Sequence, residues 1–429
     1  MFNANTADFF CLREMIFFKP AHEKTLHAFS ATLLSLVLVT HLSAHAEISM
    51  PLTQSQETSS QSSVEKAKHS KALKRQHDKV EKSPVIFHFS SVGDSRTDER
   101  IPGTSQQDKR WLTASPVLSR MIKEISHAKS EALFFNGDMI MGYAKDPMEN
   151  ERQYAFWRGM MATLMQAGTY VVPVPGNHEM QMPTKTPEGT VKLAQPYLEK
   201  QWRDNMGDLI LDVDRWNQIV KKPITYWDIN NTSTPEQDKV QTAQTQLNYS
   251  FDVGQIHFAV VNTDPVGADN VVSSSWLARD FEQAKARGAI TFLAFGHKMP
   301  FTYFPEVGGK KQADGLDVMP AERDAFWSVI ENYGATYFCG HEHVYDASQP
   351  LKAQGGKAWQ IIVGSGGSPF SVKKEDAKNP KDRMYAWADV LVRKNGALNV
   401  RILGFDEEMG PTKVISKWTI QPSLSPAVH

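Results

Sequence analysis

The chain has 429 residues, of which 41% are hydrophobic, 10% aromatic and 22% charged. This composition is typical of a globular protein with a full apolar core, and it excludes a wholly disordered, collagen-like or polytopic membrane protein. The 47 basic and 48 acidic residues leave a net charge of −1. No global basic field therefore exists to recruit nucleic acid or an anionic bilayer. With only two cysteines, Cys11 and Cys339, a disulfide scaffold is excluded.

The N-terminal residues have the pattern of an export signal. Residues 26–46 contain no Asp, Glu, Lys or Arg, and the sequence Ala-His-Ala at 44–46 is a small-x-small cleavage site. We therefore predict a signal peptide over 1–46 and a periplasmic or secreted mature chain without a membrane span. The alternatives are an uncleaved N-terminal anchor and a start at Met15.

A linker and one folded domain are expected after the signal peptide. Residues 47–84 are rich in Gln, Ser, Lys and Glu and have almost no large apolar side chains. Because such a segment cannot bury a core, we predict a disordered or partly helical linker. A single domain over 85–420 and a tail over 421–429 complete the chain.

Short apolar runs alternate with amphipathic stretches through most of this domain. In chain order, the patterns predict strands at 85–92, 132–136, 170–174, 255–261, 289–295 and 335–339, and helices at 115–128, 151–165, 274–287 and 321–333. Residues 181–246 have the character of an insertion with helices at 191–202 and 209–220. Four runs beginning at 358, 385, 398 and 412 alternate in polarity and predict antiparallel strands. The repeated strand–helix order indicates an α/β core.

Five apolar runs end in a glycine followed by polar residues, within the sequences SVGDSR, FFNGDM, VPGNHE, AFGHKMP and CGHEH. Ligands in α/β folds gather outside the carboxyl ends of strands, so we expect these side chains to meet at one edge. They are Asp94, Asp138, Asn177, His178, His297, His341 and His343. Carboxylate, amide and imidazole donors suit first-row metals, and six of them suffice for two ions if one carboxylate bridges.

These five motifs, in this order, resemble those of the calcineurin-like metallophosphoesterases, and within them most closely the purple acid phosphatase-like branch. The resemblance extends through QLNYSFDVGQIHFAVVNTD and WQIIVGSGGSP and covers most of the mature chain. It implies an α/β fold, in the four-layer α+β arrangement, in which two packed mixed β-sheets are flanked by helices. The predicted helical insertion would be added to that fold, and the C-terminal antiparallel strands would fit the second sheet.

The resemblance also implies a role for each motif residue. Two metal ions, among Mn, Fe, Zn, Ni and Mg, would be bound. Asp138 would bind both ions. Asp94 and His343 would bind the first ion. The second ion would be bound by Asn177, His297 and His341. His178 would lie beside the leaving group as a general acid or hydrogen-bond donor, with Glu179 orienting it. A metal-bound hydroxide would attack phosphorus directly.

Two positions depart from the family pattern. Many members have His two residues after the first Asp, where this chain has Arg96, which does not ligate metals. Purple acid phosphatases have a Tyr three residues after the bridging Asp, where this chain has Met141, and Tyr143 is two residues further on. A purple Fe(III)-tyrosinate centre is therefore not expected. Arg96 would instead hold a substrate phosphate, or form an ion pair with a ligand carboxylate.

The predicted function is hydrolysis of a small-molecule phosphate monoester or diester by an exported enzyme. One alternative is a phosphodiesterase acting on nucleotides or phospholipid headgroups, and the insertion at 181–246 would decide between them. A second is a metal-containing binding protein with little turnover, which the presence of Arg96 allows. The sequence gives no indication of the oligomeric state.

Overall fold

The computed structural model of the chain describes residues 83–96, 115–187, 189–304, 306–307, 310–377 and 379–422. The predicted signal peptide, nearly all of the predicted linker and most of the predicted tail lie outside these residues. No helix within the described ranges combines the length and the apolar character that a membrane span requires.

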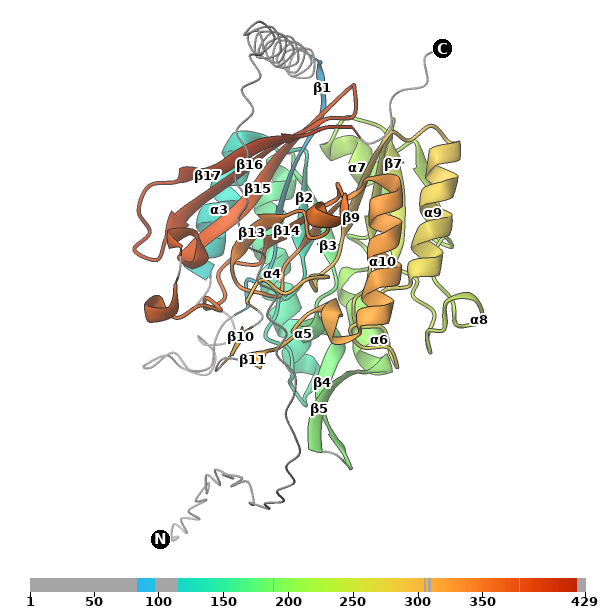
Figure 1. Cartoon of the computed structure of the whole chain (residues 1–429), viewed down its shortest axis with the longest axis vertical. Coiled ribbons are helices and arrows are strands. Elements are labelled where there is room, and N and C mark those ends of the chain that lie inside the picture. Colours follow the sequence, from blue (N-terminus) through green and yellow to red (C-terminus); the bar gives the residue numbers. More distant parts are fainter. Residues whose placement is uncertain are drawn as a thin grey trace, which may run out of the picture. The chain divides into compact units, whose positions relative to one another are not determined.

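Two mixed β-sheets form the centre of the structure (Figure 1). The first has the strand order β17-β16-β15-β1-β2-β3. Its strands are β1 (Val85–Val92), β2 (Ala132–Asn136), β3 (Tyr170–Val174), β15 (Met384–Arg393), β16 (Leu398–Asp406) and β17 (Lys413–Ile420). The strands β1, β2 and β3 are mutually parallel, and the others are antiparallel to their neighbours.

The second sheet has the order β13-β14-β12-β9-β8-β7-β6. Its strands are β6 (Tyr226–Trp227), β7 (Tyr249–Val253), β8 (Ile256–Val260), β9 (Thr291–Phe295), β12 (Thr336–Cys339), β13 (Tyr345–Ser348) and β14 (Trp359–Val363). The strands β8, β9, β12 and β14 are parallel. Two short hairpins lie outside both sheets, and they consist of β4 (Gln181–Thr186) with β5 (Gly189–Ala194), and β10 (Glu306–Val307) with β11 (Lys310–Lys311).

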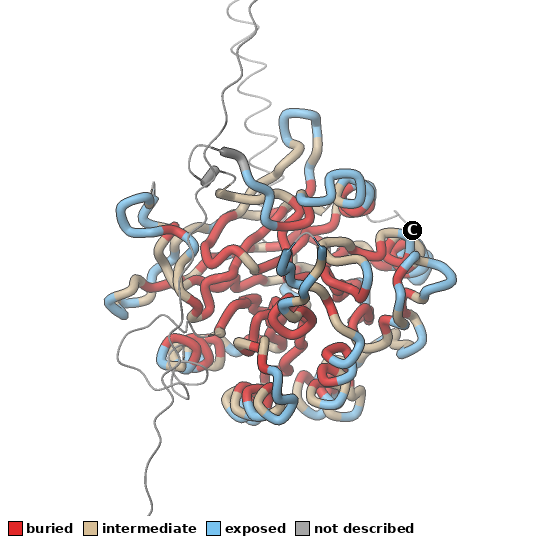
Figure 2. The backbone as a smooth tube through the Cα atoms, turned by 90° about the horizontal axis from the view of Figure 1, so that it is seen from below, coloured by how far each residue is buried: buried red, intermediate tan, exposed pale blue. Residues whose placement is uncertain are grey.

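Aromatic side chains join the two sheets face to face. The rings of Phe134 on β2 and Phe295 on β9 stack with centroids 3.8 Å apart, and Phe89 on β1 lies edge-on to Phe338 on β12 at 5.5 Å. All four are fully buried. Burial of such rings contributes most of the free energy that holds two layers together. Figure 2 shows the same pattern, with the buried backbone at the centre of the molecule.

Helices cover the outer faces of both sheets. The helices are α3 (Ser115–Ala128), α4 (Pro147–Gln166), α5 (Asn177–Met180), α6 (Pro196–Met206), α7 (Val213–Ile219), α8 (Pro235–Asp238), α9 (Ser274–Ala286) and α10 (Pro320–Tyr333). Trp157 of α4 packs edge-on against Phe135 of β2. On the second sheet, Phe281 of α9 and Trp327 of α10 belong to one buried cluster with Cys339, a free thiol. The predicted fold class is confirmed.

Local patterns predicted most of the elements well. The helix over 115–128 coincides with α3, whose buried residues recur on one face. The helix α4 begins before its predicted start at 151, because Asp146 caps it by accepting a hydrogen bond from Met148 N at 3.0 Å. In the insertion, the predicted helix over 191–202 is wrong at its start. Residues 189–194 form β5, and the helix begins only at Pro196, since the residue before a proline favours extended backbone.

The C-terminal strands were assigned to the wrong sheet. The strands β15, β16 and β17 are antiparallel as predicted, but they extend the first sheet, where β15 pairs with β1. The run beginning at 358 forms β14, which lies parallel to β12 in the second sheet, so the prediction of an antiparallel strand there is wrong with respect to β12. Its antiparallel partner is β13 on the other side.

Candidate metal centre

The predicted polar side chains come together because their strands are parallel. Asp94 and Asp138 follow β1 and β2, and Asn177 begins α5 directly after β3. The histidines of the other motifs follow β9 and β12 of the second sheet. Parallel neighbours end at the same edge, so each sheet presents its motif residues there. The contacts between Asn177 and the histidines show that these two edges meet.

Three of these residues direct an atom that could bind a metal at one point. The Asn177 Oδ1 atom lies 2.9 Å from both His297 Nε2 and His341 Nδ1, and these two nitrogens are 3.1 Å apart. Asp138 Oδ1 is 3.2 Å from His297 Nε2. Two ligands bonded at ~2.1 Å to one ion lie about 3.0–3.4 Å apart in octahedral or tetrahedral geometry. The spacing of these four atoms is therefore that of ligands around a shared cation.

The tautomer of His297 strengthens this interpretation. Its Nδ1 lies 2.7 Å from the carbonyl oxygen of Asn136, which can only accept, so Nδ1 carries a proton. In the neutral ring Nε2 then has only a lone pair, which faces the carboxylate of Asp138 and the amide oxygen of Asn177. A histidine held by a backbone carbonyl and facing other acceptors is the arrangement found in metal sites.

A second group of donors lies on the other side of Asp138. His343 Nε2 is 3.5 Å from Asp94 Oδ1, and His343 Nδ1 lies 2.5 Å from the carbonyl oxygen of Pro369. The Asp94 side chain is fully buried and that of Asp138 nearly so. Ligand atoms of Asp94, Asp138 and His297 all lie within 4.8 Å of one another. Asp138 Oδ1 thus lies 3.2 Å from His297 on one side, and a ligand atom of Asp138 lies within 4.8 Å of Asp94 on the other, a position that a bridging ligand would require.

Arg96 lies against this second group. Its Nε is 3.1 Å from Asp138 Oδ2, and its Nη2 is 3.3 Å from His343 Nε2. The ion pair with a candidate ligand carboxylate is thus present, whereas the phosphate contact stays a prediction. Burial and the Arg96 charge lower the pKa of His343 to about 4. The ring is therefore neutral at physiological pH, the form that binds metals.

The pKa values of the two aspartates shift in opposite directions. Burial raises the pKa of Asp94 well above its usual range, and the neighbouring carboxylate of Asp138 adds to this shift. Burial would also raise the pKa of Asp138, but His178, His297 and Arg96 outweigh it and hold the pKa well below its usual range. Two buried carboxylates that share a site separate their pKa values in this way. A bound cation would favour the ionised form of both.

Three of the motif residues have a strained backbone conformation. Asp94, Asp138 and His341 have φ values of 63°, 52° and 70°, in the left-handed region that side chains with a Cβ disfavour. Space is also tight, because a Cβ on Gly176 would lie 2.4 Å from the backbone nitrogen of Asp138. Strain of this kind persists only where surrounding contacts enforce it, and it is typical of functional sites.

His178 is directed at the same centre. Its Nδ1 lies 2.6 Å from the Met141 carbonyl oxygen, and its Nε2 is 3.7 Å from Asp138 Oδ2. Burial and Arg96 lower the pKa of His178 well below its usual value. A phosphate dianion beside this ring would oppose that shift, because a nearby anion favours the imidazolium form.

Glu179 contacts the backbone around the site. Its Oε2 accepts hydrogen bonds from the backbone nitrogens of Asp138 and Gly176 at 2.9 and 2.8 Å. Its Oε1 accepts from Met139 and Ile140. Glu179 therefore stabilises the loop after β2, and it acts on His178 only through that loop.

Two residues near the centre were not predicted. Tyr143 accepts a hydrogen bond from Asn177 Nδ2 at 3.1 Å, and its ring lies 4.3 Å from that of His178. Lys192, on β5, places its Nζ 4.4 Å from the Tyr143 ring. Neither contact has a sequence motif, since the partners are brought together by the fold.

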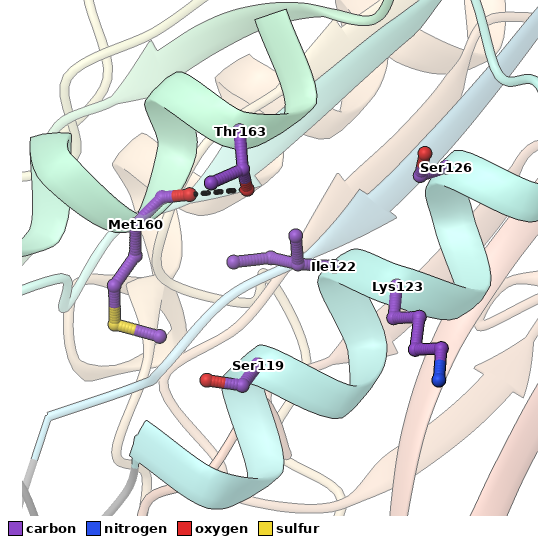
Figure 3. Close-up of a pocket in the computed structure, with 6 residues that line it drawn as sticks. All are labelled: Ser119, Ile122, Lys123, Ser126, Met160 and Thr163. Carbon is purple, nitrogen blue, oxygen red and sulfur yellow. Dashed lines mark hydrogen bonds between the residues drawn. The ribbon is translucent and has the colours of Figure 1, made fainter. Parts of the chain in front are cut away.

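A separate groove of about 410 Å³ lies between α3 and α4 (Figure 3). It is lined by Ser119, Ile122, Lys123, Ser126, Met160 and Thr163. None of these is a residue of the candidate metal centre.

Comparisons with known proteins give a family match and similar structures. The family model described as calcineurin-like phosphoesterase matches residues 114–345, more than half of the chain. A purple acid phosphatase from yellow lupin (Lupinus luteus) seeds has a similar structure at 14% identity and a TM-score of 0.50, over 79% of this chain and 54% of that one. This chain thus spans about half of the lupin structure, and so low an identity shows a shared fold alone. A dimetal phosphatase from Danio rerio matches at 12% identity and a TM-score of 0.45, over 79% and 100%. A search of curated proteins finds no match.

Proposed function

The chain belongs to the calcineurin-like phosphoesterase family, and from that premise we propose that it is an exported two-metal enzyme that hydrolyses small phosphate monoesters or diesters. The family makes it a metal-dependent phosphoester hydrolase, which argues against the alternative of a metal-containing binding protein with little turnover. The proposal therefore concerns the number of metal ions, the substrate and the export of the protein.

The observation that carries the proposal is the convergence of donor atoms from both sheets on either side of Asp138. The second ion would be held by Asn177, His297 and His341, whose donor atoms are 2.9–3.1 Å apart. The first would be held by Asp94 and His343, and Asp138 would contact both. When bound, the ions supply positive charge to the phosphate and lower the pKa of a water molecule.

The chain's own residues would handle the leaving group and the phosphate. His178 would place Nε2 toward the leaving-group oxygen, because Nδ1 is held by the Met141 carbonyl. With a phosphate dianion bound, this ring can carry the proton that the leaving group takes up. Arg96 is already in contact with Asp138 and His343, so a phosphate at the centre lies within reach of its guanidinium.

Export rests on the sequence pattern of residues 1–46, which lie outside the described residues. The choice between monoester and diester rests on the walls of the site, to which the insertion at 181–246 contributes β5. A nucleotide or phospholipid-headgroup diesterase therefore remains the second candidate.

The test compares p-nitrophenyl phosphate with bis-p-nitrophenyl phosphate. Protein stripped of metal would be assayed before and after addition of Mn, Fe, Zn, Ni or Mg, alongside Asp138→Asn. We expect activity that returns with metal in the native protein and stays absent in the variant, and the preferred ester then separates phosphatase from diesterase. Activity that survives complete metal removal would contradict the proposal.

A further inference from the structure

The β4–β5 hairpin brings a lysine to the edge of the candidate metal centre. Lys192 lies on β5, and its Nζ is 4.4 Å from the centroid of the Tyr143 ring. The same ring lies 4.3 Å from that of His178. Lys192 as a whole residue is exposed to solvent. The three side chains thus form a row that leads from the centre outward.

The ammonium of Lys192 differs from the other cations here in having no carboxylate of its own. Arg96 is paired with Asp138, and Lys298 is buried and paired with Asp264 at 2.6 Å. Within the described part of the chain, no Asp or Glu forms an ion pair with Lys192, and its ammonium lies over the face of the Tyr143 ring. A lysine held over an aromatic ring keeps its three N–H donors free for an anion.

The electrostatics around Lys192 also favour an anion. Partial burial and the positive charges of Arg96 and Lys298 lower the pKa of Lys192, and together they outweigh the opposite effect of Asp138 and Asp314. A negative group bound at the ammonium would relieve this repulsion. Because His178 lies on the leaving-group side in the proposed function, an anion at Lys192 would belong to the leaving group.

We propose that Lys192, held on the Tyr143 ring, is a subsite for an anionic leaving group, and that the enzyme prefers phosphate esters whose leaving group carries a carboxylate or a further phosphate. This inference rests on the proposed function, since His178 defines the leaving-group side. It makes the β4–β5 hairpin a determinant of specificity that lies outside the metal-binding motifs.

The experiment uses esters that differ in charge and little in shape. They are 4-carboxyphenyl phosphate, its neutral 4-carbamoyl analogue and its 4-phosphono analogue. Each would be assayed for kcat/KM with the metal-loaded native protein and with Lys192→Gln and Lys192→Arg. The matched control is Lys185→Gln, which removes the same charge from an exposed position on β4 of the same hairpin.

We expect the native protein to prefer both anionic esters over the carbamoyl ester. In Lys192→Gln this preference should fall about tenfold, because a hydrogen bond to a charged group is lost. Lys192→Arg should retain it, and Lys185→Gln should leave it unchanged. Of the carboxylate ester and the phosphonate ester, the one whose kcat/KM falls more in Lys192→Gln would identify the anion that Lys192 binds.

Two results would overturn the inference while the proposed function stands. One is equal kcat/KM of the native protein for anionic and neutral esters. The other is an equal loss for all three esters in Lys192→Gln, which would indicate a structural role. Absence of turnover for every ester under all metal conditions would instead overturn the proposed function, and this inference with it.

Discussion

The hydroxyl oxygen of Tyr143 lies 3.1 Å from Nδ2 of Asn177 and accepts its hydrogen bond. This contact fixes which end of the amide faces the centre. With Nδ2 committed to Tyr143, Oδ1 is directed at His297 and His341. A tyrosine that does not have the spacing of a metal ligand therefore orients a residue that would be one.

Tyr143→Phe should weaken metal binding without unfolding the protein. The variant keeps the ring beside His178 but leaves the Asn177 amide free to rotate. Loss of such an orienting partner typically lowers metal affinity or activity by about 10–100-fold. Metal titration of the stripped protein measures the effect directly. Tyr197→Phe, at an exposed site on α6, is the matched control and should bind metal as the native protein does.

Glu179→Gln should lower the free energy of unfolding and the activity together. All four hydrogen bonds of the carboxylate come from backbone N–H groups. A glutamine would place an NH2 group against two of those donors. We expect a loss on the order of 2–4 kcal/mol in denaturant unfolding, because charged hydrogen bonds are lost and buried donors are left unpaired. Glu408→Gln, at an exposed position, should change neither quantity.

His178→Ala separates metal binding from proton transfer. The ring faces Asp138 at 3.7 Å, but it is not needed to complete either group of donors. We expect turnover of p-nitrophenyl phosphate to fall by about 10²–10⁴-fold with the metal content unchanged. His127→Ala, on the exposed face of α3, is the control. Unchanged turnover in His178→Ala would refute the role assigned to His178.

A buried histidine far from the motifs should make stability depend on pH. The Nδ1 atom of His257 lies 2.6 Å from Asp252 Oδ1, and its Nε2 atom lies 2.9 Å from Asp280 Oδ2. Burial would lower the pKa of His257, but these carboxylates outweigh it and raise the pKa to about 9. The ordinary value in an unfolded chain is about 6.5. The charged ring therefore stabilises the fold fully below about pH 6.5, and this contribution is lost as the pH rises through about 9.

This contribution is measured as the difference in unfolding free energy between the native protein and His257→Gln. The difference should shrink by on the order of 3 kcal/mol between pH 6 and pH 9.5. The corresponding difference for His127→Gln should stay constant. A difference for His257→Gln that does not change with pH would show that the pKa of the ring is the same in the folded and unfolded chains, and it would contradict this prediction.

Sequence patterns predicted the structural features that depend on residues close together along the chain. Helix α3 and strands β1, β2 and β3 have local periodicity, and the motif glycines mark the strand ends where the donors converge. The pairing of β15 with β1 joins residues about 300 positions apart, and no local pattern carries that information. The prediction of helix for residues 191–194, which belong to β5, is wrong because a short apolar run fits both structures.

The site shows the same division. The candidate metal ligands belong to sequence motifs, so each of them could be identified from the sequence. The contacts of Tyr143 with Asn177, and of Lys192 with Tyr143, join a loop, a helix start and a hairpin that meet only in the fold. The hydrogen bonds of Glu179 could not be predicted for a related reason, since its partners are backbone groups that have no sequence signature.

The most direct test of the account is the number of metal ions bound per chain. Elemental analysis after reconstitution would be made on the native protein, on His341→Ala and on His343→Ala, which remove one donor from each side of Asp138. We expect two ions in the native protein and a loss of metal in each variant. A fully active native protein that holds a single ion, or full retention of both ions in both variants, would contradict the two-metal centre.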